Sequence, residues 1–205
     1  MAGGPDIVGS LVGSRNATLD GDHPLPNTVL LCGDKLQVND GLAMVTLQRG
    51  NRVALGGQSE ASFLYGVAGV TVLMNRGSLS LYHSQGGSGF KVKVGDVTIV
   101  PAGGPRTLGE VELAGGTLVV TAKDGSLDVE KEGATRKVAK GYTLTIAPAV
   151  RGAAASSLPG NPRVKYVRSD SASLDFGSTA NPDGAGDFAI GLHHHHHVSP
   201  IHPRH

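Results

Sequence analysis

The chain has 205 residues, of which 39% are hydrophobic and only 4% aromatic, and its formal net charge is +1 at pH 7. This charge creates no long-range field that would attract nucleic acid or an anionic membrane, so we expect neither as a partner. Glycine accounts for 31 residues, about twice its usual share of roughly 7%, which disfavours long helices and suits a chain that turns often.

The N-terminal segment, MAGGPDIVGSLVGSRN, lacks the basic stretch and apolar run of a secretory signal. We expect residues 1–7 to be a flexible start. No apolar segment approaches the ~20 residues needed to cross a bilayer, so the sequence predicts no direct membrane insertion.

Alternating apolar residues dominate the chain from about residue 28 to residue 147. In LAMVTLQRGNRVAL, Ala43, Val45 and Leu47 share one face, and the alternation resumes after Gly50-Asn51. A Gly-Asn pair between two such runs predicts a β-hairpin, because a positive φ costs these residues little.

The same pattern predicts further hairpins along the chain. VTVLMNRGSLSL is predicted to turn at Asn75-Arg76-Gly77, and TLVVTAKDGSLDVEKEG at Asp124-Gly125. FKVKVGDVTIV alternates apolar residues with lysines, which is typical of a strand with one wet face.

No stretch shows a convincing helical period. The sequence therefore predicts an all-β domain over residues 8–147, made of antiparallel hairpins that form a sandwich or an irregular β-roll. Residues 148–162 have the Ala/Ser/Pro/Gly composition of a linker. Residues 163–205 form a less regular extension, in which RVKYVRS could be one more short strand.

Residues suited to catalysis are scarce. Only His23 and His83 lie outside the last 13 residues, which leaves little for a Ser-His-Asp or Cys-His arrangement. His83 follows a predicted strand and is expected to be a solvated loop residue, whereas Cys32, beside apolar Leu31, is expected to be buried. We therefore expect no enzyme and no required cofactor.

The chain ends in a histidine-rich tail, HHHHHVSPIHPRH. Imidazole nitrogens suit Zn²⁺, Ni²⁺ and Cu²⁺, so the tail could bind these ions. A purification tag, a solvated low-complexity end and an extended segment docked on a neighbouring molecule are the alternatives. The candidate metal ligands are His193, His194, His195, His196, His197, His202 and His205.

The strand-rich stretch resembles the FecR domain, a β-rich module of bacterial envelope proteins. The resemblance begins in LLCGDKLQVNDGLAMVTLQRGNRVALGGQSEASF, where Gly33-Asp34 opens the block and a short strand, an Asx-Gly turn and an alternating strand follow. VTVLMNRGSLSLY and KDGSLDVEKEGATRKVAKGYTLTI resemble later strands of the family. PAGGPRTLGEVEL replaces the family's usual Gly-Thr strand, and the C-terminal extension has no counterpart.

This resemblance implies a periplasmic or extracellular module, without catalytic residues, that contacts other proteins. We therefore expect the chain to act in protein–protein contact or assembly. Two alternative functions remain open. The chain could be the subunit of a polymer that forms by strand addition from its termini, or it could capture transition metals through its tail.

Overall fold

The computed structural model describes residues 6–86, 89–103, 106–147 and 165–168. All of these residues belong to the first of the two units into which the chain divides, Met1–Ser171. Residues 172–205, with the histidine-rich tail, lie outside the described residues, as does the predicted linker at 148–162.

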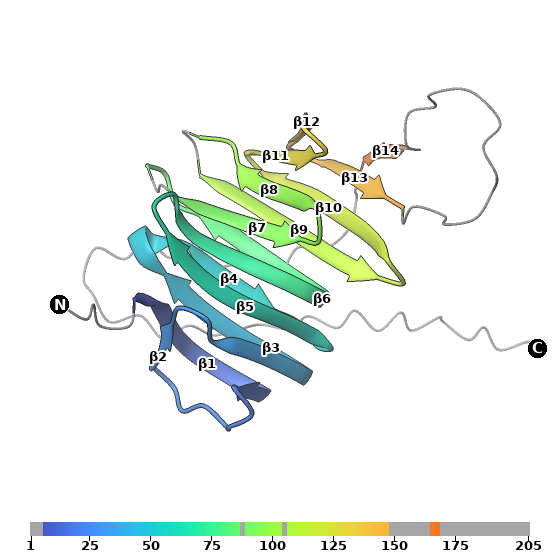
Figure 1. Ribbon diagram of the computed structural model, residues 1–205. Coiled ribbons are helices and arrows are strands. Elements are labelled where there is room, and N and C mark those ends of the chain that lie inside the picture. Colours follow the sequence, from blue (N-terminus) through green and yellow to red (C-terminus); the bar gives the residue numbers. More distant parts are fainter. Residues whose placement is uncertain (1–5, 87–88, 104–105, 148–164, 169–205) are drawn as a thin grey trace, which may run out of the picture. The chain divides into compact units, whose positions relative to one another are not determined.

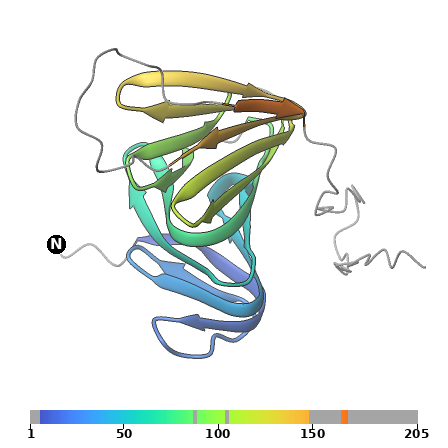
Figure 2. The same cartoon turned by 90° about the vertical axis from the view of Figure 1, so that its right-hand side faces the viewer.

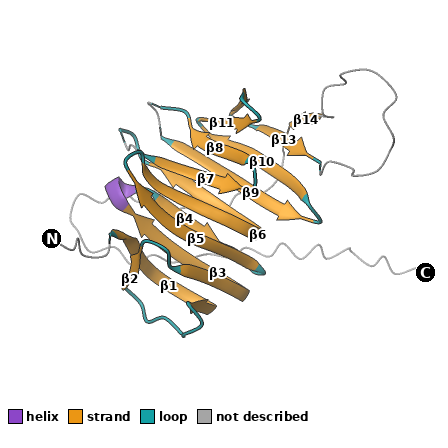
Figure 3. Ribbon diagram, viewed as in Figure 1, coloured by secondary structure: helices purple, strands orange, loops and turns teal. Residues whose placement is uncertain are grey.

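Strands make up most of the described residues (Figure 3). Among the described residues, the one helical element is the short turn η1 (Gln48–Gly50). The strands in chain order are β1 (Ile7–Leu19), β2 (Thr28–Leu31), β3 (Lys35–Leu47), β4 (Arg52–Leu55), β5 (Ser59–Gly66), β6 (Gly69–His83), β7 (Phe90–Val94), β8 (Val97–Pro101), β9 (Thr107–Ala114), β10 (Thr117–Asp124), β11 (Ser126–Lys131), β12 (Ala134–Ala139), β13 (Tyr142–Ile146) and β14 (Lys165–Arg168). The predicted all-β class is confirmed.

Pairing connects these strands into one sheet that bends into two layers. The long strands β1, β3 and β6 each contribute one half to each layer. One layer runs β2-β1-β3-β4-β6-β9-β10-β13-β14, and the other runs β1-β3-β5-β6-β7-β8-β11-β12. Strands that are close in the sequence mostly lie close together in space. The bent hairpins therefore stack on one another from the N-terminal to the C-terminal strands (Figures 1 and 2). The pairing is antiparallel except between β6 and β7.

A single hydrophobic cluster fills the space between the layers, from Val8 in β1 to Leu144 in β13. Phe63 is its largest fully buried side chain, and most other members are Val, Leu and Ala. The alternation seen in the sequence points its apolar residues into this cluster. In the confirmed β3–β4 hairpin, for example, Val45 lies opposite Val53 and both are fully buried.

The prediction of a hairpin at Asn75-Arg76-Gly77 is wrong, because β6 continues through these residues. Gly77 has a φ of +88° and bends the strand there. The first half of β6 pairs with β5 and β7, and the second half pairs with β4 and β9. The expected Asx-Gly turn is likewise a bend within β3, at Asp40-Gly41.

Asp124-Gly125 also joins the layers instead of closing a hairpin. β10 pairs with β9 and β13, whereas β11 pairs with β8 and β12. Arg106 Nη2 and Lys140 Nζ lie 3.1 and 2.8 Å from the Asp124 carboxylate. These two cations, Lys140 first, lower the pKa of Asp124, so the crossing is stabilised by charge as well as by glycine.

The short strand expected in RVKYVRS is confirmed. β14 pairs antiparallel with β13, with Thr143 opposite Val167, and so adds a strand to the domain predicted to end at residue 147. No helix within the described residues has the length and hydropathy needed to cross a bilayer.

Candidate functional site

The bends of the N-terminal strands are joined by hydrogen bonds at one end of the roll. We call this end the corner: residues Asn16, Asn39–Gly41, Gly56–Ser59 and Gly77–Ser78. Asn16 Nδ2 donates to Asp40 O at 2.6 Å, Gln58 N donates to Asn39 O at 2.7 Å, and Gly56 N donates to Ser78 O at 3.0 Å.

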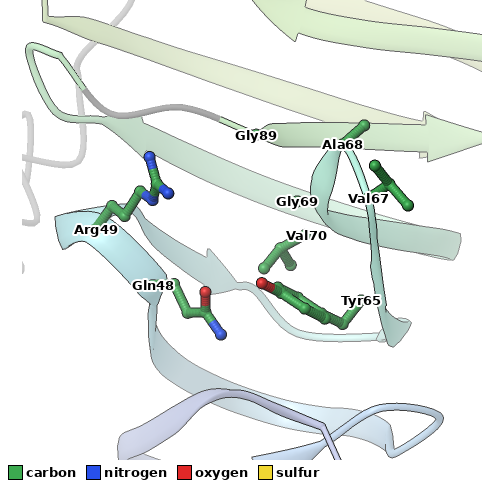
Figure 4. A pocket seen from close by; sticks show the side chains of 8 residues that line it. All are labelled: Gln48, Arg49, Tyr65, Val67, Ala68, Gly69, Val70 and Gly89. Atoms are coloured by element: carbon green, nitrogen blue, oxygen red, sulfur yellow. The ribbon is translucent and has the colours of Figure 1, made fainter.

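Away from these bends, where β3 and β5 end and β6 begins, the domain holds a cavity of about 260 Å³. Its lining residues come from η1 in one layer, from the β5–β6 hairpin in the other, and from the residue before β7. They are Gln48, Arg49, Tyr65, Val67, Ala68, Gly69, Val70 and Gly89. Figure 4 shows the hydroxyl end of Tyr65 directed towards the Gln48 side chain across the cavity.

Two glycines shape one wall of this cavity. Gly69 and Gly89 have φ values of +101° and +69°, and a Cβ on Gly69 would lie 1.9 Å from the Gly89 carbonyl oxygen. Their backbones therefore pack directly together, and Val70 N donates to Gly89 O at 2.5 Å. Only glycine allows both this approach and these φ values.

A buried polar group anchors the opposite wall. Asn51 Oδ1 accepts from Ser84 N at 3.4 Å and lies 2.8 Å from His83 Nδ1, so that ring nitrogen carries the proton and donates. Asn51 Nδ2 donates to Gln48 O at 3.2 Å. The prediction that His83 is a solvated loop residue is wrong: it ends β6, is buried, and secures η1 through Asn51.

Four exposed apolar side chains lie in the cavity lining or close to it in the fold. Val67 is fully exposed at the tip of the β5–β6 hairpin, and Leu64 and Tyr65 are 38% and 40% exposed beside it. Ile7 is 56% exposed, and its carbonyl accepts from Gln48 Nε2 at 2.7 Å. We call the cavity together with these four residues the mouth. Exposed apolar patches of this kind are typical of contact surfaces.

Cys32 lies beside the mouth and is exposed, so the prediction that it is buried is wrong. Its thiol accepts from Tyr65 N at 3.3 Å, and its own backbone N–H donates to Asp6 O at 2.9 Å. The residue packs at the end of β2, where the apolar run stops and the chain leaves the sheet.

Strand edges are weaker candidates for a contact surface, because hydrogen bonds to nearby residues or charged side chains make them less available for pairing with another chain. At β2, Thr28 N donates to Leu25 O at 3.2 Å and Leu31 N donates to Asp34 Oδ2 at 2.8 Å. The outer strand β12 carries Arg136 and Lys137.

A second cavity, of about 320 Å³, lies at the corner between Gln58, Gly77 and Glu112. None of the large exposed apolar residues lines it. The mouth is therefore the better candidate for a contact site.

The proposed metal ligands, from His193 to His205, lie outside the described residues. Within the part of the chain that the structure describes, no group of three or more His, Cys, Asp or Glu side chains could hold a metal ion. Metal capture by the tail stays a prediction. Calorimetry with Zn²⁺ and Cu²⁺ on the full chain and on a chain ending at Leu192 tests it, and affinity that survives this truncation would contradict it.

No protein-family model and no curated protein matches the sequence. The fold is similar to that of two crystal structures, at 1.65 and 2.50 Å resolution, of a protein from Parabacteroides distasonis ATCC 8503 described as a "putative anti-sigma factor". Their TM-scores are 0.52 and 0.51, each at 15% sequence identity over 66% of this chain and 60% of that chain. This chain thus spans less than two thirds of that protein's length, and the likeness concerns the fold alone.

Sequence reasoning missed the mouth. One usable signal was Tyr65-Gly-Val-Ala-Gly69, in which apolar Val67 occupies a turn where polar residues are usual. The contribution of Gln48 and Arg49 had no such signal, because it depends on two hairpins from different layers meeting at one end of the roll.

Proposed function

We propose that the chain is a FecR-like β-module of the cell envelope or extracellular space that acts by contact with another protein, without catalysis. The observation that carries this proposal is the mouth, where apolar side chains stay exposed although the same strands bury a complete core. Hydrophobic patches of this kind are rarely left uncovered unless a partner uses them.

Two further observations support the proposal. The sequence resembles the FecR domain in its glycine and apolar spacing. The similar fold in Parabacteroides distasonis belongs to a protein whose name, anti-sigma factor, denotes action on another protein.

Photo-cross-linking in the cells that produce the protein tests this proposal. A photoreactive amino acid replaces Val67 in the full chain, and the matched control replaces Lys137 on β12. Both side chains are exposed, so neither change should disturb folding. We expect a discrete protein adduct from position 67 and none from position 137. No adduct, or equal adducts from both positions, would contradict the proposal.

A second candidate, self-assembly by strand addition, is favoured by β14. This strand reaches the β13 edge across residues 148–164 and pairs with it antiparallel, so a second copy could supply the equivalent strand. If this candidate holds, we expect light scattering to detect dimers or larger species. Val167→Pro should reduce the amount of these species, because proline removes a backbone hydrogen-bond donor from β14. A single monomeric species at every concentration would rule this candidate out.

A further inference from the structure

The cavity at the corner, of about 320 Å³, lies where the bend of β6 meets two other segments of the chain. Its volume is close to the lower limit of the roughly 300–1,000 Å³ of sites that hold drug-sized ligands, so the cavity suits a small molecule. The lining residues are Gly57 and Gln58 from the turn before β5, Arg76, Gly77 and Ser78 from the bend, and residues 112–114 from the end of β9.

The charged residues of this lining, Arg76 and Glu112, have opposite signs. No ion pair joins them, and Glu112 forms none with any other described residue. The Glu112 carboxylate is therefore available to a cation from outside the domain.

Arg76 has one charged neighbour, Glu60, whose Oε2 lies 3.7 Å from Arg76 Nη2. This separation is longer than a hydrogen bond, and Glu60 already lies 2.9 Å from Lys35 Nζ. A guanidinium carries five N–H donors, and the Arg76 side chain is 50% exposed. Arg76 therefore keeps donors that can bind a carboxylate in the cavity.

The Ser78 hydroxyl adds a polar group beside Glu112. Ser78 lies opposite Glu112 in the antiparallel pair of β6 and β9, and such residues have Cβ atoms about 4.5–5.5 Å apart. The backbone of Ser78 is bonded, since its N–H donates to Ser59 Oγ at 2.9 Å and its carbonyl accepts from Gly56 N at 3.0 Å. Its hydroxyl has no hydrogen-bond partner among the described residues. The cavity thus offers a cation, an anion and a free hydroxyl, with Leu113 and Ala114 as apolar lining.

We propose that the corner cavity binds a small zwitterion, such as an amino acid or a dipeptide, with its carboxylate on Arg76 and its ammonium group on Glu112. A guanidinium binds a carboxylate through paired N–H groups, and a carboxylate accepts hydrogen bonds from an ammonium group. A ligand with one charge would leave one of the two side chains unpaired. The cavity shares no lining residue with the mouth, so this inference is independent of the proposed protein contact.

Nuclear magnetic resonance titration of the isotopically labelled full chain tests the inference with two zwitterions and two blocked probes. The zwitterions are leucine and leucyl-alanine, which differ in the separation of their charges. Leucine methyl ester lacks the carboxylate, and N-acetyl-leucine lacks the ammonium group. We expect at least one zwitterion to bind more tightly than both blocked probes and to bind more weakly as salt is added. The amide signals that shift should include those of Gly57 and Gly77, which line the cavity.

Failure of both zwitterions to bind would overturn the proposal. Binding of a blocked probe as tight as that of the better zwitterion would overturn it as well, because one charge would then suffice. Shifts confined to residues outside the corner would place the binding elsewhere and would also contradict the proposed site.

Two variants assign the two charges. Arg76→Gln should weaken binding of the better zwitterion about two- to fivefold, the effect expected for a partly exposed ion pair, and leave the methyl ester unaffected. Glu112→Gln should weaken it by a similar factor and leave N-acetyl-leucine unaffected. Both side chains are exposed, so the melting temperature of each variant should stay close to that of the wild type.

The matched controls are Lys137→Gln and Glu132→Gln, which remove one charge of each sign at exposed positions outside the cavity. Both should leave binding of the zwitterion unchanged. Losses of equal size in the controls and in the cavity variants would reflect the net charge of the chain and would overturn the proposal.

Discussion

The corner lies at the bends of the long N-terminal strands and the mouth lies where strands of both layers end, and the two regions are built differently. At the corner, Ser59 is 1% exposed, and its hydroxyl accepts from Ser78 N and donates to Ser78 O, both at 2.9 Å. At the mouth, Val67 and Tyr65 remain in contact with solvent beside a cavity. The comparison separates the part of the molecule that fixes the fold from the part left available for contact.

The largest loss of folding stability is expected from a change at the corner. Gly77→Ala should destabilise the protein by about 3 kcal/mol or more, because the new Cβ would lie 2.3 Å from Ser59 Oγ at a φ of +88°. Gly133→Ala is the matched control, since Gly133 has a φ of +77° but no atom within 4 Å of its Cβ position, and should cost about 1–2 kcal/mol. Urea unfolding measures both, and equal losses would show that the corner is not tightly packed.

A change at the wall of the mouth should cause an intermediate loss of folding stability. Asn51→Ala leaves buried partners without their hydrogen bonds and should cost about 1–3 kcal/mol. It should also loosen η1, because Asn51 Nδ2 donates to Gln48 O. Asn39→Ala, which removes an exposed side chain at the corner, is the control. Thermal unfolding that is unchanged by Asn51→Ala would contradict the anchoring role of Asn51.

Lowering the pH should reduce the stability contributed by the outer face near the corner. Hydrogen bonds from Lys35 and then Asn75 lower the pKa of Glu60 below its model-compound value of 4.5. A lowered pKa in the folded state gives stability that is present above 4.5 and is lost as the pH falls through the lowered value. The loss should be about 1 kcal/mol or less for this surface network, and Glu60→Gln should abolish it.

Unfolding of both proteins across this pH range tests that expectation. Glu132→Gln is the control, since Glu132 makes no ion pair among the described residues. If the wild type and Glu60→Gln lose the same stability on acidification, the Glu60 network does not stabilise the fold.

The smallest effect on stability is expected at the tip of the mouth. Val67→Ser alters a side chain that contacts mainly solvent, so the melting temperature should not change measurably. A clear drop in melting temperature would mean that Val67 is part of the fold and would weaken the contrast between corner and mouth.

The strands were predictable from the sequence, because alternation depends only on which side chains enter the core. Val45 and Val53 are an example, since the alternation on both sides of Gly50-Asn51 predicts the hairpin that pairs them. Which glycine segments are hairpins was not predictable. Gly50 ends a hairpin turn, whereas Gly77 and Gly125 carry the chain from one layer to the other, and all three have positive φ.

The difference lies in long-range pairing. A hairpin requires the flanking strands to pair with each other, whereas β10 and β11 pair with strands that are distant in sequence. The burial of His83 depends on the same kind of contact, since Asn51 is brought to it only by the pairing of β4 with β6. Local residue patterns carry no information about such partners.

Alkylation of Cys32 tests the central claim most directly, because this single native thiol lies beside the mouth. The rate is measured on the isolated full chain and on the complex with the protein cross-linked from position 67. The account predicts that the partner slows the reaction at Cys32, while a cysteine placed at Lys137 in a Cys32→Ser chain reacts equally fast in both states. Equal rates at Cys32 with and without the partner would contradict the mouth as the contact surface.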